Sequence, residues 1–180
     1  MSRIPTPPSI EAAPEGSRPL LETVRARFGV VPNMFRLIAN SPAALEGYLG
    51  LNGPLSKGAL DSKTRERIAL AVAELNACSY CLSAHAFLGK RFEQLDEAEV
   101  EANRKGSSKD RKADAAVRFA AKLINARGQV RKEDVDDVRM AGYSDGEIVE
   151  IVAHVAMNIF TNYVNEAFCT AIDFPLVRPE

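Results

Sequence analysis

The 180-residue sequence has few cysteines, few histidines and almost no net charge. It contains three cysteines and two histidines, and its formal net charge is -1 at pH 7. Nucleic acid and anionic membranes both require a basic surface on a binding partner, so we expect neither as a partner of this chain. No apolar run approaches the ~20 residues of a membrane-spanning helix. The 46% of hydrophobic residues is enough for a core that needs no disulfide staples.

The first eight residues, Met-Ser-Arg-Ile-Pro-Thr-Pro-Pro, lack the apolar segment of a secretory signal. We therefore expect a cytoplasmic location. Thiols stay reduced in that compartment, so a close pair of cysteines there is more typical of catalysis or metal binding than of a structural disulfide.

The spacing of apolar residues predicts an all-α fold. Five of the ten prolines fall within residues 1–19, a density that favours an extended arm over a helix. Beyond this arm, apolar residues repeat at helical spacing, and no alternation of period two extends past four residues. We expect residues 20–180 to form a single compact multi-helix domain behind the proline-rich N-terminal arm.

Caps and glycines set the expected helix boundaries. Asn76 and Ala77 mark a bend before a helix that begins at Cys78 and that Gly89 ends, while Ser144 and Glu147 form a capping box for the last helix. The charged stretch 90–112 is expected to be solvent-exposed. The expected helices cover about 20–28, 34–39, 42–51, 62–75, 78–88, 93–104, 113–127, 132–141 and 145–170.

Residues 66–85 concentrate the reactive side chains of the chain. Two of the three cysteines, Cys78 and Cys81, one of the two histidines, His85, and two carboxylates lie within these twenty residues. On a helix, neighbours three and four apart share a face, so Cys81 should lie against both Cys78 and His85. This pattern predicts a redox thiol site.

The spacing assigns separate roles to the two cysteines. A thiol reacts only as a thiolate, and an imidazole one turn beyond Cys81 reaches that sulfur directly but reaches Cys78 only through water. We therefore expect Cys81 to attack a hydroperoxide and to become a sulfenic acid. Cys78 then condenses with it to a disulfide, because Cα atoms three apart on a helix lie roughly 5 Å apart, within the range for a disulfide.

A carboxylate is expected to orient His85. Glu66 precedes an apolar run in which an unpaired charge is costly, and a helix that bends at Asn76 and returns would set it beside the imidazole. Glu74 is the competing candidate, and a salt bridge to a neighbouring basic residue is an equal alternative for Glu66. Tyr80 is either an accessory hydrogen-bond donor to the pair or simply a core residue.

The motif Glu66-x11-Cys78-Ser-Tyr-Cys81-x3-His85 resembles the signature of the alkylhydroperoxidase AhpD branch of the carboxymuconolactone decarboxylase family. The resemblance extends over nearly the whole chain after the arm. It continues through Val31-Pro-Asn-Met-Phe-Arg36, Asn40-Ser-Pro42, Gly142-Tyr-Ser-Asp145, Asn162-Tyr-Val-Asn165 and Ile172-Asp-Phe-Pro175.

The resemblance implies an all-helical protein that assembles into dimers, trimers or hexamers. It also implies that the second cysteine reacts with peroxide, that the first resolves it, and that Glu66 and His85 relay protons. The sequence departs from the best-described AhpD pattern at Tyr80, where that pattern has a histidine, so its adaptor-protein partner does not carry over. The decarboxylase branch lacks the cysteine pair, and we rank lactone decarboxylation below peroxidase chemistry.

Two further classes of function remain open from sequence. The cysteine pair and His85 supply three possible zinc ligands, with His154, Cys169 or a glutamate as a fourth. A helical oligomer that merely senses oxidation is the other alternative. His154, Asn158, Asn162, Asn165 and Cys169 also form a polar stripe on the last helix, which lines either the active pocket or a subunit interface, or else is a solvent-facing or satisfied set of polar residues.

The sequence thus predicts a cysteine-based hydroperoxide reductase without a metal or other cofactor. Its substrates are a small-molecule hydroperoxide and an unidentified thiol or dithiol reductant, and it is expected to form a homo-oligomer.

Overall fold

Nine α-helices and a short 3-10 helix make up residues 2–180, the part of the chain that the computed structural model describes, and this part contains no strand. The all-α fold is therefore confirmed. The elements are a 3-10 helix Glu15–Ser17, α1 Arg18–Phe28, α2 Asn33–Ile38, α3 Pro42–Leu55, α4 Ser62–Leu75, α5 Ser79–Phe92, α6 Glu97–Arg104, α7 Arg111–Asn125, α8 Lys132–Met140 and α9 Asp145–Phe168.

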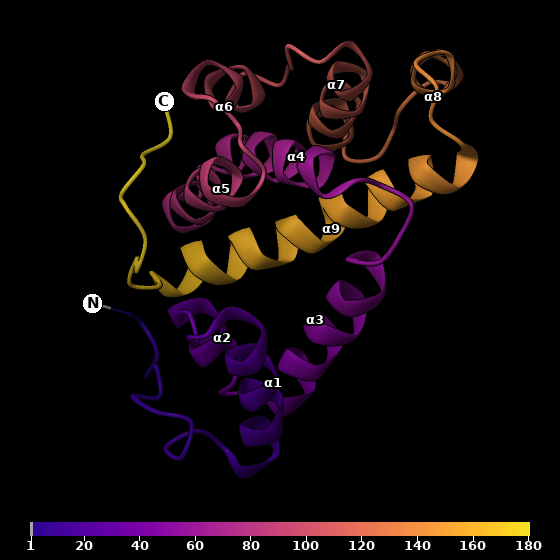
Figure 1. The fold of residues 1–180 in the computed structure, drawn as a ribbon. Coiled ribbons are helices and arrows are strands. Elements are labelled where there is room, and N and C mark those ends of the chain that lie inside the picture. Colours follow the sequence, from indigo (N-terminus) through magenta and orange to yellow (C-terminus); the bar gives the residue numbers. More distant parts are fainter. Residues whose placement is uncertain (1) are drawn as a thin grey trace.

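The long helix α9 crosses the middle of the molecule (Figure 1). Helices α4 and α5 lie on one side of it and α1 to α3 on the other, while α6 and α7 form an outer layer over α4. Helix α4 packs against α5, α6, α7 and α9. It is thus surrounded on all sides, which agrees with its apolar run: Ile68, Leu70 and Val72 have no exposed surface.

The bend expected between α4 and α5 is present. Helix α4 ends at Leu75, Ala77 adopts a left-handed backbone with φ of 51°, and the Cys78 N–H donates to the Ala73 carbonyl at 2.9 Å. This reversal makes α5 run back alongside α4, to which it is packed. A side chain early in α4 is thereby brought opposite one in the middle of α5.

The expectation that Gly89 ends α5 was wrong, because the helix continues to Phe92. A Cβ at position 89 would lie 2.9 Å from Leu95 Cδ1, so glycine serves here to let the following segment pack closely. The chain turns instead at Gln94, whose φ is 54°.

The other boundaries differ by a few residues. The capping box of α9 is present, with the Glu147 N–H donating to Ser144 Oγ at 3.2 Å and Glu147 Oε2 accepting from the Ser144 N–H at 2.7 Å. Helix α9 ends at Phe168 because Cys169 is left-handed, with φ of 50°. Helix α3 extends four residues beyond its expected end, and α1 begins at Arg18, two residues before its expected start.

Both terminal segments lie along the folded helices. The Arg3 N–H donates to the Phe168 carbonyl at 2.8 Å, and the Arg36 side chain donates to the Pro7 carbonyl at 2.7 Å. At the other end, the Val177 N–H donates to Ser83 Oγ at 2.9 Å. The C-terminal segment therefore covers one face of α5, and the two ends of the chain lie on the same side of the molecule in Figure 1.

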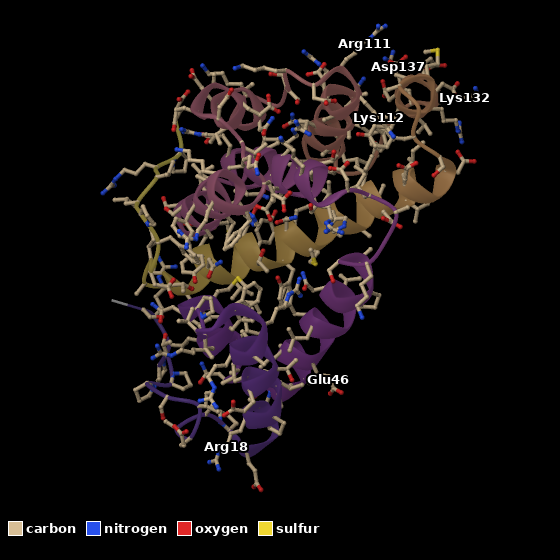
Figure 2. All side chains as sticks on the ribbon, viewed as in Figure 1. Arg18, Glu46, Arg111, Lys112, Lys132 and Asp137 are labelled. Carbon is tan, nitrogen blue, oxygen red and sulfur yellow. The ribbon has the colours of Figure 1, made fainter. Side chains whose placement is uncertain are left out.

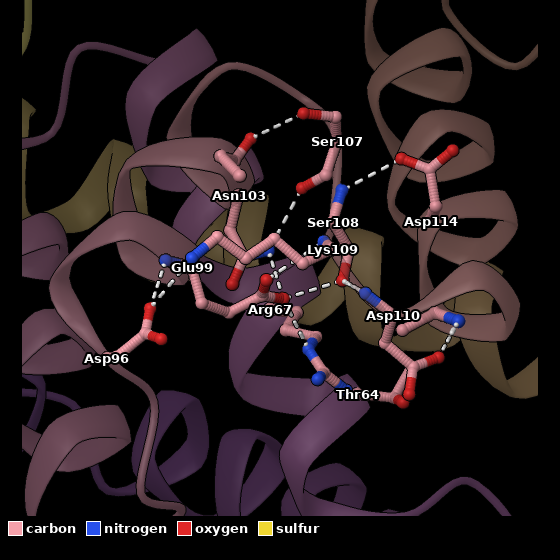
Figure 3. A network of polar contacts seen from close by, with 12 residues as sticks. Thr64, Arg67, Asp96, Glu99, Asn103, Ser107, Ser108, Lys109, Asp110 and Asp114 are labelled. Carbon is pink, nitrogen blue, oxygen red and sulfur yellow. Dashed lines mark hydrogen bonds and ion pairs between the residues drawn. The ribbon is translucent and has the colours of Figure 1, made fainter.

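Most charged side chains lie on the outside, as Arg18, Glu46, Arg111 and Lys132 do in Figure 2. Glu99 is an exception within the charged stretch 90–112 that was expected to be exposed. Its carboxylate is buried and accepts from Arg67 Nε at 2.8 Å, with further hydrogen bonds from α6 and the loop after it (Figure 3). Among residues 2–180, no helix is long and apolar enough to cross a membrane.

Candidate active site

Cys78 and Cys81 lie at the N-terminus of α5. Cys78 is the N-cap residue, and its Sγ accepts a hydrogen bond from the Cys81 N–H at 3.3 Å. Both cysteines are free and almost completely buried, with 0% and 3% of their surface exposed. The positive end of the helix dipole therefore acts on both sulfurs, and it favours a thiolate.

Cys81 is the more acidic of the two thiols. The Cys78 thiol, which is placed to donate to its sulfur, is the largest cause that lowers the pKa of Cys81, to about 7. Burial opposes this effect, while His85 and a hydrogen bond of 3.2 Å from Asn165 Nδ2 to Cys81 Sγ support it. The hydrogen bond that the Cys78 thiol donates to Cys81, together with burial, raises the pKa of Cys78. Cys81 is thus the thiol of the pair that ionises first, and Cys78 keeps its proton.

His85 of α5 and Glu66 of α4 form a hydrogen-bonded pair. His85 Nδ1 lies 2.8 Å from Glu66 Oε2, and both side chains are 22% exposed. Burial by itself lowers the pKa of His85, but the charge and hydrogen bond of Glu66 outweigh it and raise that pKa. Because Nδ1 is bonded to the carboxylate, Nε2 is the nitrogen free to exchange protons.

The structure brings the predicted residues Cys81, His85 and Glu66 to one pocket, but the contact between Cys81 and His85 differs from the expected one. His85 and Cys81 each shift the other's pKa through charge, but residues 2–180 contain no hydrogen bond between them. Asn165 of the last helix donates a hydrogen bond to Cys81 Sγ instead. Asn165 was seen in the sequence only as one member of the polar stripe on the last helix.

The two accessory candidates have other contacts. Glu74, the alternative to Glu66, accepts hydrogen bonds from Arg104 Nε at 2.7 Å and from the Glu180 N–H at 2.7 Å. Glu66, not Glu74, is therefore the carboxylate bonded to His85. The Tyr80 hydroxyl accepts from the Met34 N–H at 3.1 Å. Tyr80 therefore ties α5 to α2, and no hydrogen bond to either cysteine sulfur is among its described contacts.

Cys81, His85 and Glu66 open onto a pocket of about 850 Å³. Aromatic and apolar side chains from several helices and the C-terminal segment form much of its wall. They include Phe28, Met34, Phe35, Tyr48, Tyr80, Phe87, Phe92, Met157 and Phe174. Cys78 is not among the lining residues, so small molecules in the pocket meet the Cys81 sulfur first.

The polar stripe of α9 lies on the site side of that helix. His154 and Asn158 line the pocket, and Asn165 bonds Cys81. His154 is 4% exposed, its Nε2 has no hydrogen-bond partner among the described residues, and burial together with the charge of Arg65 lowers its pKa to about 4. Cys169 does not join the stripe, since it is the exposed C-cap of α9.

The buried amide of Asn162 is also near the thiol pair. Its Oδ1 accepts from Asn76 Nδ2 at 2.9 Å, its Nδ2 has no partner among the described residues, and its proximity contributes to the lowered pKa of Cys81. Asn162 therefore places an amide NH2 donor beside the Cys81 sulfur.

The zinc alternative lacks a set of converging ligands. Within residues 2–180, no three side chains of His, Cys, Asp or Glu lie close enough together to hold a metal ion. His85 is bonded to Glu66, and Cys169 is exposed at the C-terminal end of α9.

Sequence comparison identifies the family pattern. Residues 42–122, which include the thiol pair, His85 and Glu66, match the profile of the Carboxymuconolactone decarboxylase family. An uncharacterized protein of Haemophilus influenzae is 50% identical over 46 residues, which are 25% of this chain and 41% of that protein. The match therefore spans less than half the length of that relative.

Solved structures share the fold over nearly the entire chain. The alkylhydroperoxidase AhpD core structure of a peroxidase-related protein from Ralstonia eutropha superposes with a TM-score of 0.84 at 24% identity, covering 96% of this chain and 92% of that one. A peroxidase-related protein from Silicibacter gives 0.81 at 23% identity, covering 94% and 91%. The debrominase Bmp8, as a cysteine-to-alanine variant in complex with 2,3,4-tribromopyrrole, gives 0.76 at 22%, covering 96% and 94%.

The fold and the site define an AhpD-like helical domain with a buried cysteine pair. Residues 42–122 match the Carboxymuconolactone decarboxylase family and the fold matches the AhpD core, and both findings support the resemblance seen in the sequence.

Proposed function

We propose that this protein is a thiol-dependent hydroperoxide reductase in which Cys81 attacks and Cys78 resolves. The observation that carries the proposal is the placement of the acidic thiol: Cys81 lines the pocket, its pKa is lowered to about 7, and the His85–Glu66 pair lines the same pocket. Cys78, buried behind it with a raised pKa, has the properties of a resolving thiol.

The first step is the attack of the Cys81 thiolate on the terminal oxygen of a hydroperoxide. The O–O bond breaks, the alkoxide takes a proton from the His85 imidazolium to become an alcohol, and Cys81 becomes a sulfenic acid. Glu66 holds the imidazole by Nδ1 so that Nε2 handles the proton. The free Nδ2 of Asn162 is a donor for the oxygen that Cys81 acquires.

The second step closes the disulfide. The Cys78 sulfur loses its proton and attacks the Cys81 sulfur, the S–O bond breaks, and the departing hydroxide takes up that proton through His85 to leave as water. The two thiols thus supply the two electrons that reduce the hydroperoxide to an alcohol and water. An external thiol or dithiol then reduces the disulfide and is itself oxidised.

Turnover of cumene hydroperoxide with dithiothreitol tests the proposal. We expect the wild-type protein to consume many equivalents of hydroperoxide per chain and Cys81→Ser to consume none. A protein that oxidises once and stops is a redox sensor, the alternative that the sequence left open. Zinc that copurifies at one equivalent and blocks alkylation of both cysteines would instead favour the metal-binding alternative.

Reductive dehalogenation is a second candidate, favoured by the aromatic wall of the pocket. The same thiol pair supplies two electrons, so an aryl bromide would yield the arene, bromide and a proton as the disulfide forms. Release of bromide from 2,3,4-tribromopyrrole in the same dithiothreitol assay separates this activity from peroxide reduction. A decarboxylase would need neither Cys81 nor a reductant, so its activity would persist in Cys81→Ser and without dithiothreitol.

The assembly and the compartment belong to this proposal as well. Helix α9 exposes the large apolar side chains of Val149, Val152, Phe160 and Tyr163, which suits burial against a second copy of the chain. We expect a homo-oligomer, which light scattering after size-exclusion chromatography would measure. The free cysteine pair suits a reducing compartment, the cytoplasm.

A further inference from the structure

At the far end of the helix that carries the thiols, the pocket has a cation, Arg91, that makes no ion pair with any residue from 2 to 180. Cys81, Ala84, His85, Leu88 and Arg91 all line the pocket from α5. Their spacing of three and four places them on one face of that helix. Ten residues separate Cys81 from Arg91, so their backbones lie about 15 Å apart along the helix axis.

A continuous row of aromatic rings connects the two ends. The ring of Tyr80 lies 5.8 Å from that of Phe174, and Phe174 lies 6.0 Å from Phe87. The guanidinium of Arg91 lies 6.0 Å from the centre of the Phe87 ring and 5.7 Å from that of Phe92. All four rings line the pocket, and Phe92 is 64% exposed. An apolar chain can therefore follow these rings from the thiol to the guanidinium.

Arg91 has no carboxylate partner within residues 2–180, where it makes no ion pair of 4 Å or less. The two acidic side chains that line the pocket beside Glu66 have other partners. Glu93 accepts from Ser62 Oγ at 2.8 Å, and Asp173 accepts from the Asn33 N–H at 2.8 Å. The guanidinium is thus available to an anionic group that arrives with the substrate.

We propose that the pocket selects hydroperoxides of long-chain carboxylic acids, with the carboxylate on Arg91, the hydrocarbon chain along the aromatic row and the peroxide at Cys81. The inference rests on the proposed peroxidase function and names its substrate class. A planar guanidinium matches a carboxylate with two hydrogen bonds, and the aromatic row supplies the apolar contact. The reaction is the one described above, and its product is the corresponding hydroxy acid.

The first test compares 13-hydroperoxyoctadecadienoic acid with its methyl ester, below the concentration at which either forms micelles. Because an ion pair near solvent contributes up to ~1 kcal/mol, we expect kcat/KM for the acid to exceed that for the ester roughly fivefold. Arg91→Ala should reduce this ratio to about one, and Arg91→Lys should retain part of it. Lys90→Ala is the matched control: Lys90 is the adjacent residue of α5, is paired with Glu97 and does not line the pocket, so the ratio should not change.

The second test does not depend on catalysis. Isothermal titration calorimetry of the Cys81→Ser variant measures binding of the 13-hydroxy acid and of its methyl ester. Tighter binding of the acid that disappears in Arg91→Ala and weakens in high salt supports the inference, even if no hydroperoxide turns over and the proposed function fails. Equal affinity for acid and ester, or no binding of either, overturns it while turnover of cumene hydroperoxide leaves the peroxidase function standing.

Discussion

The carboxylate of Glu66 lies 2.8 Å from the imidazole Nδ1 of His85, although nineteen residues separate them in the chain. The reversal at Ala77 brings the early part of α4 opposite the middle of α5 and so creates this contact. The charge of Glu66 raises the pKa of His85 and so favours an imidazolium near the Cys81 sulfur.

Loss of either member of this pair should slow peroxide reduction. General acid–base assistance contributes ~10² to 10⁴ in rate, so we expect His85→Ala to lose activity within that range. Glu66→Gln should lose less, since the amide still bonds Nδ1 but no longer raises the pKa of His85. Stopped-flow measurement of Cys81 oxidation checks this, with Glu46→Gln, an exposed carboxylate on α3, as the control. Equal rates in Glu66→Gln and the wild type would contradict the assigned role.

The attacking thiol should follow a pH profile set by its lowered pKa. Since the thiolate is the reactive form, the rate of Cys81 oxidation should rise with pH through about 7 and then level off. Asn165→Ala removes a hydrogen bond that stabilises the thiolate, so the midpoint should move upward by about 1. Iodoacetamide alkylation of Cys81, followed by peptide mass against pH, measures the midpoint. An unchanged midpoint in Asn165→Ala would show that the hydrogen bond does not act on the charge.

Cys78→Ser should separate attack from resolution. Without the resolving thiol, the sulfenic acid on Cys81 persists, and dimedone should label it after one equivalent of hydroperoxide. Cys169→Ser is the control, because Cys169 is exposed at the end of α9 and should not affect either step. Normal turnover of Cys78→Ser with dithiothreitol would remove Cys78 from the mechanism.

The buried ion pair of Arg67 and Glu99 should dominate the stability of the α4–α6 contact. Glu99→Gln leaves the guanidinium buried without its counter-ion, which costs about 3–5 kcal/mol in the free energy of unfolding. Glu101→Gln, on the same helix but in an exposed pair with Lys105, should leave the free energy of unfolding nearly unchanged because solvent screens that pair. Urea denaturation compares the two variants.

The same pair predicts an acid sensitivity. Burial raises the pKa of Glu99, but hydrogen bonds from Ser108, Asn103 and the Lys109 N–H outweigh this and lower it to about 2. The carboxylate therefore contributes its full stabilisation above its ordinary value of 4.5, and the contribution is lost as the pH falls toward 2. Wild-type stability should fall through this range more steeply than that of Glu99→Gln.

Gly89 should be intolerant of a side chain. The added Cβ of Gly89→Ala would meet Leu95 Cδ1 at 2.9 Å, and overpacking of this kind costs about 1–3 kcal/mol. At Gly47, inside α3, nothing lies within 4 Å of the added atom, and Gly47→Ala should stabilise by about 0.5–1 kcal/mol. Thermal unfolding of the two variants should therefore shift in opposite directions.

The sequence was sufficient for the fold class and for the proximity of the candidate residues Cys78, Cys81 and His85. Helical spacing placed Cys81 on one face with His85, and the bend at Asn76 and Ala77 supported Glu66 as the partner of His85. The sequence did not decide between Glu66 and Glu74 as the partner of His85. That choice depends on the hydrogen bond that Arg104 of α6 donates to Glu74. Asn165 was hidden within a polar stripe, since its contact to Cys81 spans 84 residues and arises only from the packing of α9 on α5.

The aromatic row could not be predicted from the sequence either. Phe87 and Tyr80 are connected by Phe174, a residue of the C-terminal segment that follows the last helix. No periodicity predicts where a non-helical segment lies. Its position depends on tertiary contacts such as the hydrogen bond between Val177 and Ser83.

Intact-mass analysis of the protein after one equivalent of cumene hydroperoxide tests the central claim most directly. We expect the chain to lose two hydrogens and the peptide that contains both Cys78 and Cys81 to carry the disulfide. A gain of oxygen on Cys169, or full retention of both thiols at positions 78 and 81, would contradict the proposed chemistry.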